Sequence, residues 1–347
     1  MRIFSTTIVA LILFCPWSTS FAKEQGAWSF AVSGDSRNCG DIVMPAIAAD
    51  LHKKNPSFYW HLGDFRKGED IDDDIAHDNR QKKTLTIEQY RAMEWQDFIE
   101  NQINPFSPVP VYLAIGNHEL IGHSREEYLQ YFHSWLNLGK ASATYYHWIH
   151  QGVDFISLDN ASHDQFDAKQ MDWVKSVLAA DEINPKIHTI VVGMHAALPD
   201  SISFSHSMSE SKDPNAVTSG RELYQQLLHL RGTGKKNVYV LASHSHFFME
   251  GIFNTAYWKA HGGVLPGWII GTAGALRYAL PKDASLAIKS QTHVYGYLLA
   301  KVKATGKIDF EFHLLEKDAV LQQTKAKYGD ALVTYCFEQN AINKLPE

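Results

Sequence analysis

This chain has only three cysteines in 347 residues, no excess of positive charge and few long hydrophobic runs. Its formal net charge is −6 with histidine neutral, so it carries no strong signal for nucleic acid or an anionic membrane as a partner. Beyond the N-terminus, no apolar stretch is long enough to span a bilayer. There is also no repeat of fixed period and no low-complexity linker. The length suits one large domain or two smaller ones.

Residues 1–22 have the pattern of an export signal. Arg2 supplies a positive start, 8–14 form a short apolar stretch, and Ser20-Phe21-Ala22 is a small-x-small cleavage site. An N-terminal anchor helix is the alternative, but the apolar stretch is short. We expect a cleaved signal peptide over 1–22 and a secreted or periplasmic chain over 23–347, which forms a single domain. Cleavage removes one of 32 cations and none of 38 acids, which leaves a net charge of −7.

Two cysteines, Cys39 and Cys336, remain after cleavage. In an oxidising compartment they could form one disulfide that fastens the C-terminal tail beside the start of the chain. Two unpaired buried thiols are the alternative, and the sequence leaves this choice open.

Short apolar, β-branched or aromatic runs bounded by polar residues, glycine or proline predict strands. They occupy 28–32, 58–62, 109–115, 144–149, 153–158, 187–192, 238–241 and 268–270. Two further runs, 295–302 and 308–315, surround a Thr305-Gly306 turn and predict an antiparallel hairpin.

Helical patterns lie between many of these strands. One covers 42–53, and a second covers 87–103 behind the capping pair Thr86 and Gln89. Asp167 and Gln170 open a third that runs to about residue 180, and Ser219 opens a fourth that ends near residue 232. The alternation predicts an α/β fold in which two β-sheets pack together with helices outside.

Two segments resemble surface insertions. Residues 67–83 are highly charged around Asp72-Asp73-Asp74, and we expect a solvated loop there. Residues 201–219 are rich in serine and begin close to His195. A solvated loop is again the simple interpretation, and a role in shaping a substrate pocket is the alternative.

Metal-ligand side chains follow the ends of five predicted strands. The five motifs are Gly34-Asp35-Ser36-Arg37, Gly63-Asp64, Gly116-Asn117-His118-Glu119, Gly193-Met194-His195 and Ser243-His244-Ser245-His246. Ligands of α/β sheets gather at the carboxyl ends of strands, so these motifs can converge in one crevice. Their carboxylates, amide oxygen and imidazoles suit first-row metals such as Fe, Mn, Zn or Co.

This donor set predicts the hydrolysis of phosphate esters. The two oxygens of Asp64 can bridge two ions, and two ions about 3.5–4 Å apart can activate a shared water for attack on phosphorus. His118 lies beside Asn117 and is placed to protonate the leaving alkoxide, because imidazole titrates near neutral pH. Glu119 is expected to orient neighbouring groups rather than to bind metal.

The five motifs, in this order, are similar to those of the calcineurin-like metallophosphoesterases, a superfamily that contains purple acid phosphatases and many phosphodiesterases. The resemblance runs from about residue 28 to residue 315. It implies a four-layer arrangement, a β-sandwich flanked by helices, with a site for two divalent or trivalent metal ions at one edge. By position, the first ion would take Asp35, Asp64 and His246. The second ion would take Asp64, Asn117, His195 and His244.

Arg37 departs from the family pattern, because the first motif usually has histidine at this position. A guanidinium group stays protonated and cannot bind a metal. Arg37 could instead hold a phosphate oxygen. The first metal site could be weak, or filled only with substrate. The protein could also be an inactive relative.

We therefore expect an exported phosphoesterase that cleaves phosphate mono- or diesters of small molecules or nucleotide-like compounds through a metal-activated hydroxide. In this reading Arg37 and Asn117 help to hold the phosphate and His118 acts as the acid. The alternative is a catalytically impaired binding module, marked by Arg37. The preference for mono- or diesters, the metal and the oligomeric state stay open.

Overall fold

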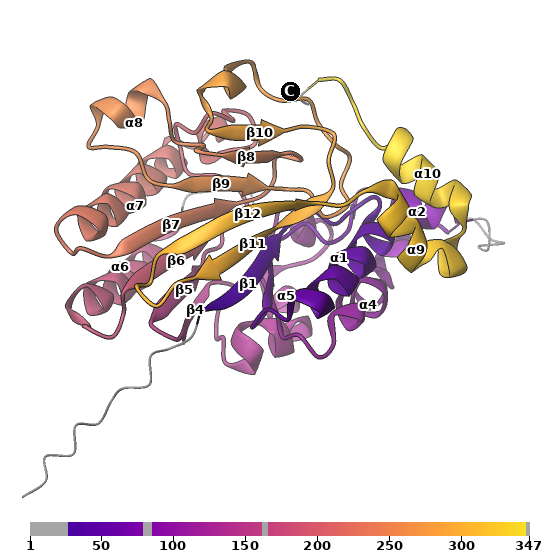
Figure 1. Ribbon diagram of the computed structural model, residues 1–347, viewed down its shortest axis with the longest axis horizontal. Helices are drawn as coiled ribbons and strands as arrows, with labels where there is room; N and C mark the ends of the chain where they lie inside the picture. Colours follow the sequence, from indigo (N-terminus) through magenta and orange to yellow (C-terminus); the bar gives the residue numbers. More distant parts are fainter. Residues whose placement is uncertain (1–26, 79–84, 162–165, 345–347) are drawn as a thin grey trace, which may run out of the picture.

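Two mixed β-sheets pack face to face at the centre of the computed structural model, which describes residues 27–78, 85–161 and 166–344 (Figure 1). The five-stranded sheet has the order β12-β11-β1-β2-β3. Its strands are β1 (Trp28–Ser33), β2 (Tyr59–His61), β3 (Val111–Leu113), β11 (Gly296–Val302) and β12 (Ile308–Leu314). The predicted signal peptide lies outside the described residues.

The seven-stranded sheet has the order β10-β8-β9-β7-β6-β5-β4. Its strands are β4 (Tyr146–His150), β5 (Val153–Ser157), β6 (Thr189–Gly193), β7 (Asn237–Ala242), β8 (Phe248–Glu250), β9 (Gly267–Ile270) and β10 (Lys289–Gln291). Strands β1, β2 and β3 are mutually parallel, and so are β5, β6, β7 and β9. Their carboxyl ends can therefore present loops along one edge of each sheet. The two-sheet α/β prediction is confirmed, and so is the antiparallel β11–β12 hairpin.

Aromatic side chains fill the space between the sheets. Phe30 of β1 meets Phe155 of β5 with ring centroids 4.9 Å apart, and Trp60 of β2 meets Trp148 of β4 at 5.1 Å. Gly193 at the end of β6 makes room for this layer, because a Cβ atom built on it would lie 2.1 Å from the Trp60 ring. Close packing of the sheets therefore requires glycine two residues before His195.

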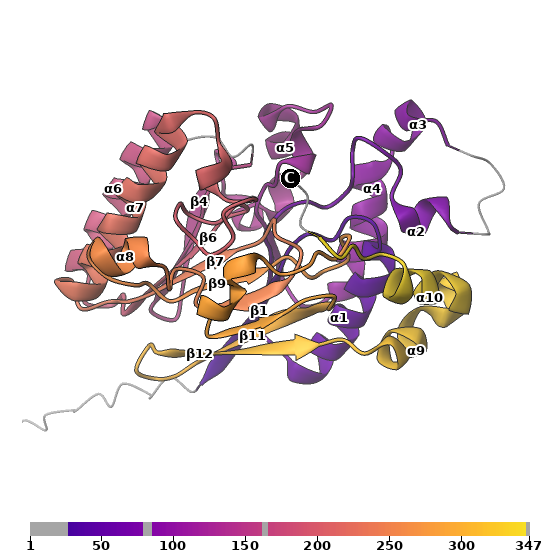
Figure 2. The same cartoon turned by 90° about the horizontal axis from the view of Figure 1, so that it is seen from above.

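Helices flank the sheets (Figure 2). Helices α6 (Ala168–Ile183) and α7 (Pro214–Gly232) share an apolar core with β6 and β7, which contains Val174, Leu178, Ile190, Val192, Leu223 and Leu227. Helix α1 (Gly40–Lys54) contacts β11 and the C-terminal helix α9 (Lys317–Tyr328), which is followed by α10 (Asp330–Glu338). Of the helices that the structure describes, none has the length and apolar character needed to cross a membrane.

Two helix predictions need correction. The helix expected over 87–103 is divided into α3 (Ile87–Arg91), α4 (Glu94–Phe98) and a π-helical turn (Ile99–Ile103), although the predicted Thr86–Gln89 capping box is present. Helix α7 begins at Pro214 rather than at Ser219. Asp213 caps it by accepting a hydrogen bond from Asn215 N, and proline suits the first helical position.

Residues 67–78, the described part of the charged segment 67–83, are not simply a solvated loop. Asp72 and Asp74 are buried, and both lie near the buried guanidinium of Arg66, at 3.5 Å and 3.9 Å from its Nη1. Asp72 also accepts a hydrogen bond from Tyr90 Oη. The acidic run therefore packs around an arginine that lies three residues beyond Gly63, a contact that charge composition alone does not reveal.

Cys39 and Cys336 form a disulfide, which settles the alternative that the sequence left open. The bond joins the residue before α1 to α10, with Cα atoms 5.9 Å apart and a sequence separation of 297. Both cysteines are buried. The bond fixes the C-terminal helices to the segment that follows Arg37.

Replacing both cysteines, in Cys39→Ser/Cys336→Ser, is expected to lower the free energy of unfolding by about 2–5 kcal/mol, because the unfolded chain loses a long-range crosslink. Chemical denaturation in the absence of reductant measures this difference. A reducing agent should destabilise the wild type by a similar amount and leave the double variant unchanged. Equal stability of the oxidised wild type and the double variant would contradict the prediction.

Candidate metal centre

The predicted metal ligands lie on loops that leave the carboxyl ends of five strands. Asp35, Asp64 and Asn117 follow β1, β2 and β3 of one sheet, whereas His195 and His244 follow β6 and β7 of the other. Backbone hydrogen bonds join neighbouring loops, from Asp35 N to the Gly63 carbonyl at 2.9 Å and from Ser243 N to the His195 carbonyl at 2.8 Å. The packing of the two sheets brings all five loops to one place.

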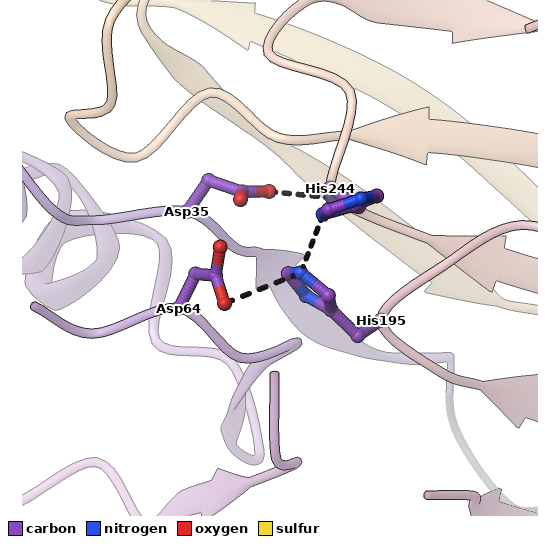
Figure 3. Close-up of side chains that lie close together, drawn as sticks. All are labelled: Asp35, Asp64, His195 and His244. Carbon is purple, nitrogen blue, oxygen red and sulfur yellow. Dashed lines mark hydrogen bonds and ion pairs between the residues drawn. The ribbon is translucent and has the colours of Figure 1, made fainter. Parts of the chain in front are cut away.

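Three of these residues have an unusual backbone conformation. The φ angles of Asp35, Asp64 and His244 are 58°, 61° and 64°, which is the left-handed region. Such a conformation costs a residue other than glycine about 1–3 kcal/mol and persists only where the surrounding structure enforces it. Strain of this kind concentrates at functional sites, and here it affects three residues whose side chains point toward a common centre (Figure 3).

Three polar atoms of these loops meet around His195 Nε2. Asp64 Oδ1 lies 3.3 Å from it, Asn117 Oδ1 3.0 Å and His244 Nδ1 2.9 Å. The other ring nitrogen of His195 lies 2.8 Å from the Leu62 carbonyl, to which it can donate only as Nδ1–H. In neutral His195 the Nε2 atom therefore carries the lone pair, which lies beside the Asp64 and Asn117 oxygens.

The electrostatics of the cluster favour a bound cation. Burial acts to lower the pKa of His195, but the Asp64 carboxylate outweighs it and raises that pKa to about 9. Burial acts to raise the pKa of Asp64, yet the charges of His118 and His195 hold it well below its usual value. Both side chains are buried. The site thus attracts positive charge, which a proton or a metal ion can supply.

The donor set fits a metal ion. Ligand atoms of Asp35, Asp64, His195 and His244 lie within 4.8 Å of one another, and all four residues are buried. Asp64 Oδ2 accepts no hydrogen bond from any residue in the described parts of the chain. The protein therefore has a buried Asp/His cluster of mixed N/O donors, as first-row transition metals prefer.

Asp35 is fixed by the motif that contains His244 and His246. Its Oδ2 atom accepts hydrogen bonds from the Ser243 hydroxyl and from His244 N, the latter at 2.7 Å. Its Oδ1 atom lies 3.2 Å from His246 Nε2. The first and last motifs of the sequence are therefore in direct contact, as their predicted convergence requires.

Arg37 lies inside this cluster. Its Nη1 atom donates to His118 Nε2, and its Nη2 atom lies 3.1 Å from His246 Nε2. Its Nε atom is 3.7 Å from Asp64 Oδ2. Burial acts to lower the pKa of Arg37, but Asp64 and other anionic neighbours raise it further, so this group is a permanent cation.

His118 faces the Nη1 atom of Arg37, whereas His246 faces Nη2. Its backbone N–H donates to Asp64 Oδ1 at 3.0 Å, and its Nδ1 atom lies 2.6 Å from the Lys67 carbonyl. Glu69 Oε2 is 3.0 Å from the same nitrogen. Burial acts to lower the pKa of His118, whereas Asp64 and Glu69 act against it, and the net direction is upward.

Three residues near the cluster were not identified from the sequence. Tyr278 stacks on His246 with ring centroids 4.0 Å apart, and the His206 ring lies 4.9 Å from that of His244. Glu69 is the third. His206 belongs to the serine-rich segment, which follows His195, and Glu69 belongs to the charged segment, which follows Asp64. This closeness in sequence to a predicted ligand was the only indication that either residue lies near the cluster. No pattern marks Tyr278.

Glu119 orients the loops, as expected. Its carboxylate accepts hydrogen bonds from three backbone N–H groups, those of Asp64 at 2.8 Å, Phe65 at 2.7 Å and Gly116 at 2.7 Å. The side chain is buried. It therefore ties the loop after β2 to the loop after β3, and so sets the distance between Asp64 and Asn117.

Comparison with known proteins agrees with this geometry. Residues 39–248 match the calcineurin-like phosphoesterase family. The matched region contains Asp64, Asn117, His195, His244 and His246, and it begins after Asp35 and Arg37. No curated protein sequence matches the chain.

Several solved structures share the fold. A purple acid phosphatase, PPD1 from yellow lupin (Lupinus luteus), has a TM-score of 0.55 and 17% identity over 84% of this chain and 52% of its own. GAP50, described as the anchor in the inner membrane complex of Plasmodium, has a TM-score of 0.54 and 13% identity over 93% of this chain and 98% of its own. PhoD has a TM-score of 0.53 and 14% identity over 83% of this chain and 68% of its own. The chain thus spans about half the length of the lupin protein.

Glu119→Gln is expected to lower the free energy of unfolding by about 1–3 kcal/mol, because the amide group leaves backbone N–H donors without an acceptor. The measurement is best made at pH 8, since burial and the Asp64 charge raise the pKa of Glu119 to about 7. Glu126→Gln, at an exposed position of α5 (Arg125–Tyr131), is the matched control. If both variants unfold at the same denaturant concentration, Glu119 does not have this role.

Proposed function

This chain belongs to the calcineurin-like phosphoesterase family, and on that premise we propose that it is a metal-dependent hydrolase of phosphate mono- or diesters. The observation that carries the proposal is the meeting of Asp64, Asn117, His195 and His244 donor atoms around one buried point. A substrate of this class is a small molecule or a nucleotide-like compound with an accessible phosphoryl group. No covalent intermediate with the protein is required.

Asp64, Asn117, His195 and His244 would hold a divalent ion such as Mn, Zn, Fe or Co. When bound, such an ion activates water and withdraws charge from the phosphoryl oxygens. Glu119 and the Leu62 carbonyl keep these ligands in position through the contacts described above. The prediction of two ions remains a prediction, and its first site depends on Arg37.

Arg37 would bind the phosphoryl group. Its two terminal nitrogens face His118 and His246, and 12% of its side chain is exposed, so solvent reaches part of this residue. A phosphate oxygen is a stronger acceptor for these N–H groups than a neutral imidazole is, because the bond joins opposite charges. Substrate would therefore draw Arg37 away from the two histidines and be oriented by it.

His118 would protonate the leaving group. Its Nδ1 atom is held at the Lys67 carbonyl, which directs Nε2 toward Arg37 and the cluster. A substrate phosphoryl group held by Arg37 would bring its ester oxygen near Nε2. His118 thus lies beside the expected reaction centre without being one of the proposed ligands.

We also propose that the protein is exported. A buried disulfide between Cys39 and Cys336 is typical of oxidising compartments and supports the expected signal peptide. The secreted or periplasmic protein would act on phosphoesters outside the cytoplasm.

A binding role without catalysis is the second candidate. The observation that favours it is the position of Arg37, whose guanidinium faces His246 and Asp64. The fold is also found in GAP50, which is described as an anchor. In this case the cluster would be structural, and metal-loaded protein would not turn over phosphoesters.

The test is the hydrolysis of mono- and bis-nitrophenyl phosphate by purified protein that has been stripped of metal and reloaded with single metals. We expect turnover of at least one ester that a chelator abolishes and metal restores. His195→Ala should reduce it by at least about 10²-fold, more than loss of a group that only orients ligands. His229→Ala, an exposed histidine of α7, is the matched control. Metal-loaded protein that cleaves neither ester would contradict the proposal and favour the binding role.

For His118→Ala, we expect bound metal to be retained and cleavage of alkyl phosphates to fall by about 10²–10⁴-fold. Nitrophenyl esters should be affected much less, because nitrophenolate leaves without protonation. Rates for a series of leaving groups, together with metal content, measure this. An equal loss for all leaving groups would remove His118 from the role of acid.

A further inference from the structure

The guanidinium of Arg37 lies among the atoms expected to bind the first metal ion, and we infer that it takes the place of that ion. The chain then binds one metal ion, through Asp64, Asn117, His195 and His244, beside a permanent cation supplied by its own sequence. This inference deepens the proposed function and rests on it for its catalytic meaning, but metal content tests it independently of turnover.

The contacts of Arg37 coincide with the first ligand set. That set consists of Asp35, Asp64 and His246, and Arg37 Nη2 lies 3.1 Å from His246 Nε2 while Nε lies 3.7 Å from Asp64 Oδ2. Asp35 Oδ1 lies 3.2 Å from the same His246 nitrogen. Two of the three residues that would hold an ion therefore face the guanidinium instead, and the third, Asp35, lies against His246.

His246 is held in the form that accepts from Arg37. Its Nδ1 atom lies 2.6 Å from the Leu276 carbonyl, to which it donates, so Nε2 carries the lone pair. That lone pair faces Arg37 Nη2. The Tyr278 ring, 4.0 Å away and nearly parallel, packs against the imidazole and keeps it from turning. A metal ion would need the same lone pair.

The charges of the buried side chains also argue that Arg37 replaces the first ion. The side chains of Asp35 and Asp64 are fully buried, and buried carboxylates need a nearby cation. Arg37 supplies one that cannot be lost by deprotonation. A dication in contact with Asp35 and His246 would meet this guanidinium at short range in a site shielded from water, where like charges repel strongly.

The proposed ligands of the second ion are separate from Arg37, because the two oxygens of Asp64 contact different groups. Oδ1 lies 3.3 Å from His195 Nε2 and accepts from His118 N at 3.0 Å, whereas Oδ2 is the oxygen that faces Arg37. Asn117 Oδ1 and His244 Nδ1 lie 3.0 Å and 2.9 Å from the same His195 nitrogen that Oδ1 approaches. One ion can therefore be bound while Arg37 keeps its contacts.

The experiment counts metal ions in the wild type, Arg37→His and Arg37→Lys. Each protein is stripped with a chelator, reloaded with Mn²⁺, freed of unbound ion and analysed by mass spectrometry of the metal and by electron paramagnetic resonance. We expect one ion per chain and the six-line signal of isolated Mn²⁺ in the wild type. Arg37→Lys, the matched control that keeps a cation, should also bind one. Arg37→His replaces the cation with a donor and should bind two, with the signal of a coupled pair.

Two ions per chain in the wild type or in Arg37→Lys would overturn the inference, as would none in the wild type or one in a folded Arg37→His. Circular dichroism and melting curves establish that each variant is folded. The wild-type count and signal decide the question even if a variant does not fold. One ion without turnover of any phosphoester would instead contradict the proposed function and leave the inference standing. Two ions in the wild type, together with turnover, would support the proposed function and overturn the inference.

Discussion

The burial of two carboxylates at the junction of the two sheets is the constraint on which the site depends. Asp35 and Asp64 are fully buried, both have a left-handed backbone, and both are close to histidines. Such an arrangement is stable only when positive charge lies beside it. Arg37 supplies that charge at Asp64 Oδ2, and we propose that a metal ion supplies it beside Oδ1, which lies 3.3 Å from His195 Nε2. The loops, the capping of their backbone by Glu119 and the packing of the sheets all serve to maintain this geometry.

The fold provides the rigidity that the strained loops need. Aromatic pairs between the sheets, such as Trp60 with Trp148, fix the distance between strands that carry Asp64 and those that carry His195. Gly193 allows Trp60 to lie against β6, so the same close contact that closes the core also positions the loop of His195. Ligands contributed by two different sheets are thus held more firmly than ligands on a single flexible loop could be.

Much of this arrangement could be predicted because its signals are local. Donor residues that directly follow an apolar run indicate strand ends, and the capping pairs at Thr86 and Asp167 mark helix starts that the structure contains. The rest depends on contacts between distant segments. The burial of Asp72 and Asp74 requires Arg66, and the early start of α7 depends on Asp213 and Pro214, which the serine-rich composition concealed. The family resemblance already placed Arg37 at the position of a ligand histidine, but its contact with His246, and that of Tyr278 with His246, could not be derived from spacing.

The most direct test of the central claim is anomalous X-ray diffraction from crystals of the zinc-loaded wild-type chain. The account predicts one strong peak at about 2.0–2.3 Å from donor atoms of Asp64, Asn117, His195 and His244, with the Arg37 guanidinium still next to His246. Zinc bound elsewhere, or these four side chains turned away from one another with no peak between them, would contradict it.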